Sequence, residues 1–223
     1  QATQAPSKSY HVFLHLLDEQ GQLIAQHDGP PRLGLYPTSA WSAHERAVVE
    51  FAELAAALSQ AGVEVHVLDE PAVAPSPDAV FPNNWVSLHH DGTVVLYPML
   101  APSRRRERRL EFLADLEARG GFAVSRLVDL THHELADRFL EGTGSVVFDH
   151  ALRVAYACIS PRTDVAVLDE LCEELGYEPF VFESTDVDGV PVYHTNVVLS
   201  IGRRVAVGCA ESVPEARRGA LIE

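Results

Sequence analysis

Hydrophobic positions along the chain follow the order strand, turn, strand and helix, and this order returns further along the sequence. The first copy predicts a strand over 80–86, a turn over 89–92 that contains Asp-Gly, a returning strand over 93–100 and a helix over 102–118. A closing strand is expected over 123–128. The pattern therefore predicts a mixed α/β structure.

Two further copies follow the first. The second predicts strands over 144–148, 153–159 and 179–182 with a helix over 164–175, and the third predicts strands over 192–201 and 204–209 with a helix after Pro214. Sheet-and-helix repeats of this length indicate a propeller-like or pseudo-symmetric array.

The N-terminal part of the chain has its own pattern. Residues 12–27 predict a β-hairpin, and an irregular stretch rich in Gly and Pro follows it. A helix is expected over 45–61 because apolar residues recur at helical spacing and Gly62 comes directly after them. The next residues, 63–68, alternate as a strand does.

Polar residues interrupt the hydrophobic pattern at the same step of successive copies, near the start of the first strand. They are Asp78, Asn83 and Asn84 in the first copy, Glu141 and Thr143 in the second, and His194 and Asn196 in the third. Equivalent strand ends of a pseudo-symmetric array converge towards its axis, so these side chains are expected to meet in one pocket. Carboxylates there would bind a planar cation such as a guanidinium, and a histidine would supply or remove protons. Amide side chains suit a neutral ureido group equally well.

Each of these residues also has a purely structural interpretation. Asp78 fits a turn, and Asn83 with Asn84 fits a polar bulge. Glu141 fits a position that simply precedes a glycine loop, and His194 fits a histidine satisfied within the core. Their shared place in the repeat is what favours a functional site.

Composition narrows the classes of function. The formal charge of −15 argues against nucleic acid or an anionic membrane surface as the main partner. No apolar run approaches the roughly 20 residues of a membrane-spanning helix. The three cysteines are far apart and odd in number, which favours a reducing, cytoplasmic compartment over a disulfide framework.

Other local patterns carry less chemistry. The basic run over 104–109 is expected to be a solvated helix face. The His-His pairs at 89–90 and 132–133 lack carboxylate or Cys companions at metal-ligand spacing, so no metal site is expected. Gly142 and Gly144 form no phosphate loop, because no Lys-Ser or Lys-Thr follows them.

Four ordered motifs give the chain a family resemblance. They are PDAVFPNNWVSLH with LYPM, FLEGTGSVVFD, AYACISPRTD and VYHTNVVLSIG. Together they resemble the guanidino-group-modifying (pentein) superfamily of arginine deiminases, dimethylarginine hydrolases and amidinotransferases, and most of all its citrulline-utilisation hydrolases. The resemblance covers about residues 42–223 and implies a five-bladed α/β propeller that needs no cofactor.

The resemblance also implies roles for individual residues. Asp78 and Glu141 would grip the nitrogen-rich head group of the substrate, and His194 would be the general acid and base. Arg162 would hold the substrate carboxylate. The pocket would be lined by Asn83, Asn84 and Asn196.

Three departures from the superfamily pattern change the expectation. Asn83, Asn84 and Asn196 stand where the deiminases have acidic residues, which favours a ureido group. The superfamily's nucleophilic cysteine lies in a last repeat that this chain does not reach, whereas Cys158, Cys172 and Cys209 are expected in the core. Residues 1–41 do not fit and instead resemble a β-sandwich tail of glycosyltransferase-type proteins. The predicted division is thus an irregular segment over 1–41 and an incomplete pentein domain over 42–223.

The function expected from these observations is hydrolysis of the guanidino or ureido group of an arginine- or citrulline-like amino acid. Without the nucleophile, this chain is expected to be inactive by itself. A binding module for arginine-like ligands and a structural domain without a ligand remain as alternatives. Unpaired strand edges favour pairing with another chain, which is compatible with a homo-oligomer.

Overall fold

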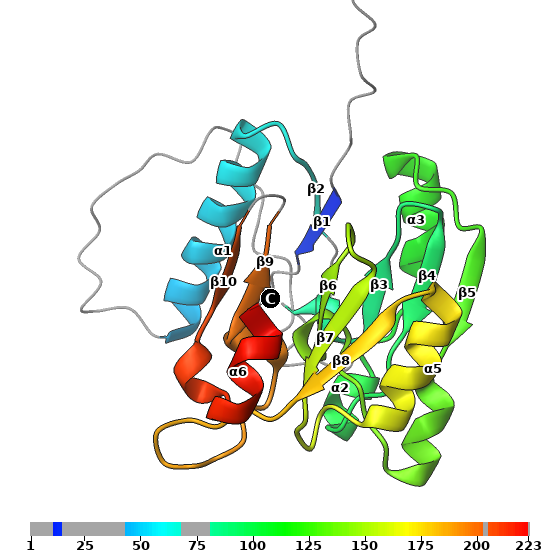
Figure 1. Cartoon of the computed structure of the whole chain (residues 1–223). Coiled ribbons are helices and arrows are strands. Elements are labelled where there is room, and N and C mark those ends of the chain that lie inside the picture. Colours follow the sequence, from blue (N-terminus) through cyan, green and yellow to red (C-terminus); the bar gives the residue numbers. More distant parts are fainter. Residues whose placement is uncertain (1–10, 15–42, 68–80, 203–204, 223) are drawn as a thin grey trace, which may run out of the picture. The chain divides into compact units, whose positions relative to one another are not determined.

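The computed structural model describes residues 11–14, 43–67, 81–202 and 205–222 (Figure 1). The chain divides into two compact units, one comprising 1–82 with 110–122 and the other comprising 83–109 with 123–223. No helix among the described residues is both long and apolar enough to cross a membrane.

The first unit contains two helices and a parallel strand pair. Helix α1 (Ala43–Gln60) ends before Gly62, whose φ of 83° suits glycine, and β2 (Glu64–Val67) follows it. Strand β1 (His11–Leu14) pairs parallel with β2. Both α1 and β2 were predicted, whereas the second half of the predicted N-terminal hairpin lies outside the described residues.

The predicted helix over 102–118 is wrong as a single element. It is two helices, α2 (Pro102–Arg105) in the second unit and α3 (Glu111–Gly120) in the first. Helix α2 ends at Arg105 with Arg106 as its C-cap, and the side chains of Arg104 and Glu107 form an ion pair with an N–O distance of 3.0 Å next to that end.

The second unit repeats one sheet topology, as the sequence pattern predicted. Strands β3 (Val86–Leu88), β4 (Thr93–Leu96) and β5 (Arg126–Asp129) form the first sheet. Strands β6 (Val146–Asp149), β7 (Val154–Cys158) and β8 (Glu178–Phe182) form the second. In each sheet the first two strands are antiparallel and the third is parallel to the second. Strands β9 (Leu199–Ile201) and β10 (Ala206–Gly208) form the antiparallel part of a third copy.

Three predicted strands begin later in the structure than the sequence pattern predicted. Each begins with a short helical turn: η2 (Pro82–Asn84) precedes β3, α4 (Gly142–Ser145) precedes β6, and η4 (Thr195–Val197) precedes β9. These segments contain Pro, Asn, Gly, Ser and Thr, which favour local turns over strand pairing. Apart from Asp78, which lies outside the described residues, the polar residues that interrupted the hydrophobic pattern therefore lie in or beside these turns.

One helix of the second unit packs against its two three-stranded sheets. Helix α5 (Val165–Leu175) was predicted closely, because Asp164 caps its N-terminus by accepting from the backbone N–H groups of Ala166 and Val167 at 2.9 and 3.2 Å. Its C-terminus ends at Gly176, with φ 69°. The remaining short elements are η3 (Thr131–Ala136), η5 (Ala210–Ser212) and the C-terminal α6 (Glu215–Ile222).

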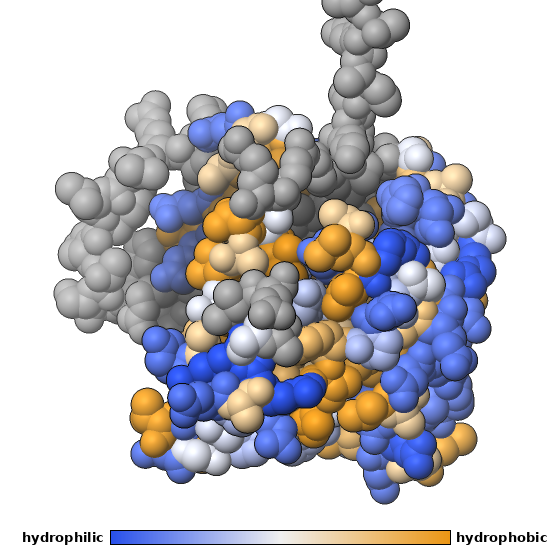
Figure 2. Space-filling model, in the orientation of Figure 1, coloured by the Kyte–Doolittle hydropathy of each residue, from blue (hydrophilic) through white to orange (hydrophobic). Residues whose placement is uncertain are grey.

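The main hydrophobic core lies between the two three-stranded sheets and α5. Its buried residues include Val95 and Tyr97 from the first sheet, Ala157 from the second and Leu168 from α5. A smaller cluster joins Phe182 of β8 to the C-terminal residues. Figure 2 shows hydrophilic residues along β5 and α5, which is consistent with an apolar inner face on α5.

Protonation of His89 is expected to couple stability of the fold to pH. Burial lowers the pKa of His89 from 6.5 to about 4, despite attraction by Asp91. The unfolded chain then binds a proton more readily, so this contribution to stability is complete above pH 6.5 and is lost as pH falls towards 4. We expect His89→Asn to flatten the pH dependence of the unfolding free energy in this window, measured by urea denaturation. The control is Leu152→Gln, at an exposed position without a titratable group, and it should keep the wild-type slope.

Candidate active site

Three helical turns of the second unit come together at the predicted site. A Cβ atom added to Gly142 in α4 would lie 2.2 Å from the backbone oxygen of Asn83 in η2, and the φ of Gly142 is 48°. The Asn83 side-chain amide also donates to Thr143 Oγ1 at 3.2 Å. Only glycine permits this approach, so η2 and α4 are held in direct contact.

Glu141 is the centre of the site. Its residue is 0% exposed, and its Oε2 atom lies 2.8 Å from His194 Nε2 and 2.9 Å from Arg162 Nη1. The other carboxylate oxygen accepts from the Leu100 backbone N–H at 3.2 Å. His194 thus reaches this buried carboxylate from 53 positions further along the chain.

The contacts around Glu141 favour its charged form. Burial raises the pKa of Glu141, but the hydrogen bonds from His194 and Arg162 outweigh burial and hold this pKa below its usual range. The result is a buried anion between an imidazole and a guanidinium. Such a carboxylate can fix the orientation of the His194 imidazole.

Backbone contacts fix the position of Glu141. The Ser145 hydroxyl accepts from the Glu141 backbone N–H at 3.0 Å and donates to the Arg162 carbonyl at 2.7 Å. Thr195 Oγ1 donates to the Ser145 carbonyl and accepts from the Cys158 backbone N–H at 2.8 Å. These bonds join α4, β7 and η4 around the carboxylate.

A second buried ion pair, Arg104 with Glu107, holds Asn84 of η2 in place beside the site. Arg104 and Glu107 are 5% and 2% exposed, and Arg104 Nη1 donates to Asn84 Oδ1 at 2.8 Å. This bond turns the Asn84 amide nitrogen towards the Glu141 carbonyl, 3.3 Å away. The expectation of a solvated basic face over 104–109 is thus wrong, because Arg104 is buried and Arg108 pairs with Glu134 at 2.5 Å.

The predicted residues fall into three groups. Glu141, Arg162 and His194 are in direct contact, and the buried Asn84 adjoins them. Asn83 and Asn196 lie in the same set of turns but are exposed. Asp78 lies outside the described residues, so its part in the pocket stays a prediction.

Several residues of the site were not predicted. Ser145 and Thr195 hold the turns together by hydrogen bonds, and the ring of Tyr193 packs tilted against that of His194, with ring centroids 4.8 Å apart. The Arg162 guanidinium lies 5.6 Å from the centre of the Tyr193 ring, within reach of a cation–π interaction. An aromatic residue directly before the candidate histidine was the one available sequence signal.

The cysteines differ from their prediction at one position. Cys158 and Cys172 are buried as expected, and burial raises the pKa of both thiols, that of Cys172 to about 11. Cys209 is exposed, so its assignment to the core is wrong. It directly follows β10, which is itself exposed along its length.

A family model matches residues 37–223, and its description is N,N dimethylarginine dimethylhydrolase, eukaryotic. The chain belongs to this dimethylarginine dimethylhydrolase family. No protein with a curated description matches the chain. The family match confirms the resemblance to the guanidino-modifying superfamily that the motifs indicated.

Solved structures agree with the family on the fold. The N-terminal domain of ArgZ bound to substrate, an arginine dihydrolase from Cyanobacteria, has a TM-score of 0.62 and 22% identity, over 82% of this chain and 61% of that one. A dimethylarginine dimethylaminohydrolase adduct has a TM-score of 0.60 and 15% identity, over 90% and 69%. Unliganded AgrE has a TM-score of 0.65 and 18% identity, over 96% and 28%. The family member described here therefore has the predicted pentein-type α/β fold and spans only part of these chains.

Substitution at Gly144 is expected to disturb the site locally. An alanine Cβ would lie 2.4 Å from Asn84 Nδ2 and 2.9 Å from His194 Nδ1, so these side chains must move. We expect Gly144→Ala to lower the unfolding free energy by about 1–3 kcal/mol and to shift the NMR signals of the His194 ring. Gly219→Ala in α6 meets nothing within 4 Å and should cost no stability. An unchanged His194 spectrum in Gly144→Ala would contradict the packing described.

Replacement of the central carboxylate is expected to change stability on the acid side. Because its folded-state pKa is lowered, Glu141 contributes stability that is complete above its ordinary pKa of 4.5 and is lost as pH falls below it. We expect Glu141→Gln to lower the unfolding free energy by about 1–3 kcal/mol at pH 7 and less at pH 3. The matched control is Glu173→Gln, at an exposed position of α5. Its unfolding free energy at pH 7 should differ from that of the wild type by nearly zero.

Proposed function

We propose that this family member is a hydrolase acting on the guanidino or ureido group of an arginine- or citrulline-like amino acid. The observation that carries the proposal is the buried, ionised Glu141 between His194 and Arg162. This arrangement supplies an oriented proton carrier and a cation beside it. The membership of the dimethylarginine dimethylhydrolase family supports the same chemistry.

In the proposed reaction His194 moves protons at both steps. A cysteine thiolate adds to the amidine carbon and forms a C–S bond, and the amine leaves with a proton from His194. Water then adds to that carbon as His194 removes a proton, and the C–S bond breaks to release the product and the thiolate. Glu141 orients the imidazole throughout, since its oxygens already accept from protein donors.

The proposal places the substrate carboxylate on Arg162. Its side chain is 32% exposed, so it reaches solvent while its Nη1 atom bonds Glu141. A guanidinium in this position can bind a carboxylate through charge-assisted hydrogen bonds. Asp78 is proposed to bind the head group at the other end of the substrate.

The asparagine residues support a preference for a neutral head group. Asn83 and Asn196 are exposed beside the site, and neither adds negative charge that would hold a guanidinium. Asn84 is held by Arg104 and the Glu141 carbonyl. We therefore propose that a ureido or otherwise altered head group binds at least as well as a guanidino group.

The attacking thiolate is proposed to come from outside these 223 residues. The buried Cys158 and Cys172 have raised pKa values, which disfavour the thiolate. Cys209 is exposed and its Sγ lies 3.9 Å from Glu211 Oε2. The same observations favour the second candidate function, a module that binds arginine-like ligands without converting them.

A turnover assay separates the two functions and tests the cysteine argument. We expect the 223-residue chain to form no citrulline or ornithine from arginine, dimethylarginine or citrulline above the level of its His194→Ala variant. Turnover that disappears in Cys209→Ser would instead make Cys209 the nucleophile. If a longer chain that contains a further cysteine binds the ligand but still does not convert it, the binding module is favoured.

Calorimetry with two ligands tests the role of Arg162. Arginine carries an α-carboxylate, whereas agmatine is the same molecule without it. We expect Arg162→Gln to weaken arginine binding by about 10-fold or more and to leave agmatine binding unchanged. An equal loss for both ligands would show that Arg162 acts only through Glu141, and unchanged arginine binding would remove Arg162 from the substrate site.

A further inference from the structure

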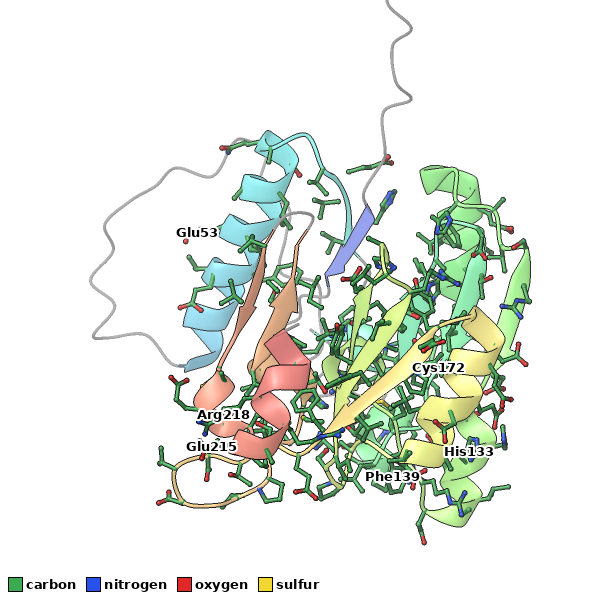
Figure 3. All side chains as sticks on the ribbon, in the orientation of Figure 1. Glu53, His133, Phe139, Cys172, Glu215 and Arg218 are labelled. Atoms are coloured by element: carbon green, nitrogen blue, oxygen red, sulfur yellow. The ribbon has the colours of Figure 1, made fainter. Side chains whose placement is uncertain are left out.

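A cluster of metal-ligand side chains lies away from the candidate active site, where η3 meets α5. His132 and His133 are in η3, directly after β5, and Glu170 is in α5. Their potential ligand atoms all lie within 4.8 Å of one another. Figure 3 shows His133 beside α5. We propose that His132, His133 and Glu170 bind one divalent transition-metal ion, such as Zn²⁺.

Both imidazole rings lie close to the Glu170 carboxylate. His133 Nε2 lies 2.7 Å from Glu170 Oε2, and His132 Nε2 lies 3.8 Å from Glu170 Oε1. The second distance is too long for a hydrogen bond. Ligands of a tetrahedral zinc ion at about 2.0–2.2 Å lie roughly 3.3 Å apart. Each histidine–carboxylate pair would therefore reach this spacing after a shift of about half an ångström, and the histidine nitrogens lie within 4.8 Å of one another.

A hydrogen bond behind His132 prepares it to bind a metal. Its Nδ1 atom lies 3.2 Å from the Asp129 carbonyl oxygen, which can only accept, so Nδ1 carries the hydrogen. The lone pair is then on Nε2, the atom that faces Glu170. The Asp129 side chain fixes the start of η3, because it accepts hydrogen bonds from the Thr131 backbone N–H at 2.9 Å and from the Thr131 hydroxyl at 2.6 Å. Histidine ligands of metals commonly have such a carbonyl partner.

An ordinary ion pair explains only part of this cluster. It accounts for the short contact between His133 and Glu170, whereas His132 lies 3.8 Å from Glu170 and its ring packs tilted against that of His133, with ring centroids 4.2 Å apart. Protonating both rings would place two positive charges side by side. One divalent ion instead uses both neutral rings and the carboxylate, and this donor set suits Zn²⁺, Cu²⁺ or Ni²⁺. The side chains of His132 and Glu170 are 57% and 39% exposed, so the ion can enter from solvent and keep water as a further ligand.

The spacing argument missed this site because its carboxylate is distant in sequence. Glu170 lies 37 residues after His133. It reaches the histidines only because α5 packs across both sheets. The proposal is independent of the hydrolase function, since none of its residues belongs to the Glu141 site.

Zinc titration of the metal-free chain tests the proposal. We expect one saturable site by calorimetry, and a loss of affinity of at least about 10-fold in His132→Asn and in Glu170→Gln. The control is His90→Asn, an exposed His-His position outside the cluster, which should bind zinc as the wild type does. Circular dichroism of each variant would show that the fold is retained.

A crystal soaked in zinc and measured at the zinc absorption edge locates the ion. An anomalous peak between the two rings and the Glu170 carboxylate is expected. Wild-type affinity in both ligand variants, or a peak only at another position such as Cys209, would overturn the proposal. So would the absence of saturation at zinc concentrations up to about 1 mM.

Discussion

The site of this protein depends on one buried carboxylate and on the imidazole and guanidinium that hold it. An ionised Glu141 without partners would be strongly unfavourable at 0% exposure, so removing Arg162 would leave its charge uncompensated and removing His194 would leave it without a hydrogen-bond partner. The three groups come from three different segments of the second unit. The ion cluster is therefore satisfied only when the turns before β6 and β9 and the residues after β7 are all in place, which couples the site to the packing of that unit.

Repetition of one strand motif explains how these segments meet. Each copy enters its first strand through a short helical turn, and the turns of successive copies lie against one another. Glycine at 142 and 144 removes the Cβ atoms that would collide with Asn83, Asn84 and His194. Small residues thus allow the close approach, and polar residues beside them supply the chemistry. This is why fold and site cannot be separated in this family member.

Ion pairs and hydrogen bonds of charged side chains also connect elements outside the Glu141 site. Arg104 and Glu107 support Asn84, and Glu134 accepts from Arg108 and from the Met99 backbone. Met99 precedes Leu100, whose N–H reaches Glu141. The chain before α2 is consequently held by acidic residues on both sides. Arg104 and Arg108 of the basic run therefore form ion pairs with acidic residues of the same chain.

The sequence by itself determined the order of the repeats, the strands that form their sheets, the caps of α5 and the set of Glu141, Arg162 and His194. Hydrophobic periodicity carries the order of the elements because it is local, whereas Arg162 was added to Glu141 and His194 by the family resemblance of the motifs. The tertiary structure decided the helical starts of the strands, the break between α2 and α3, the burial of Arg104 and the exposure of Cys209. It also decided the meeting of Glu170 with His132 and His133. The burial of Arg104 against Asn84 and the meeting of His133 with Glu170 arise from contacts between residues far apart in sequence, where packing overrides what a local pattern favours.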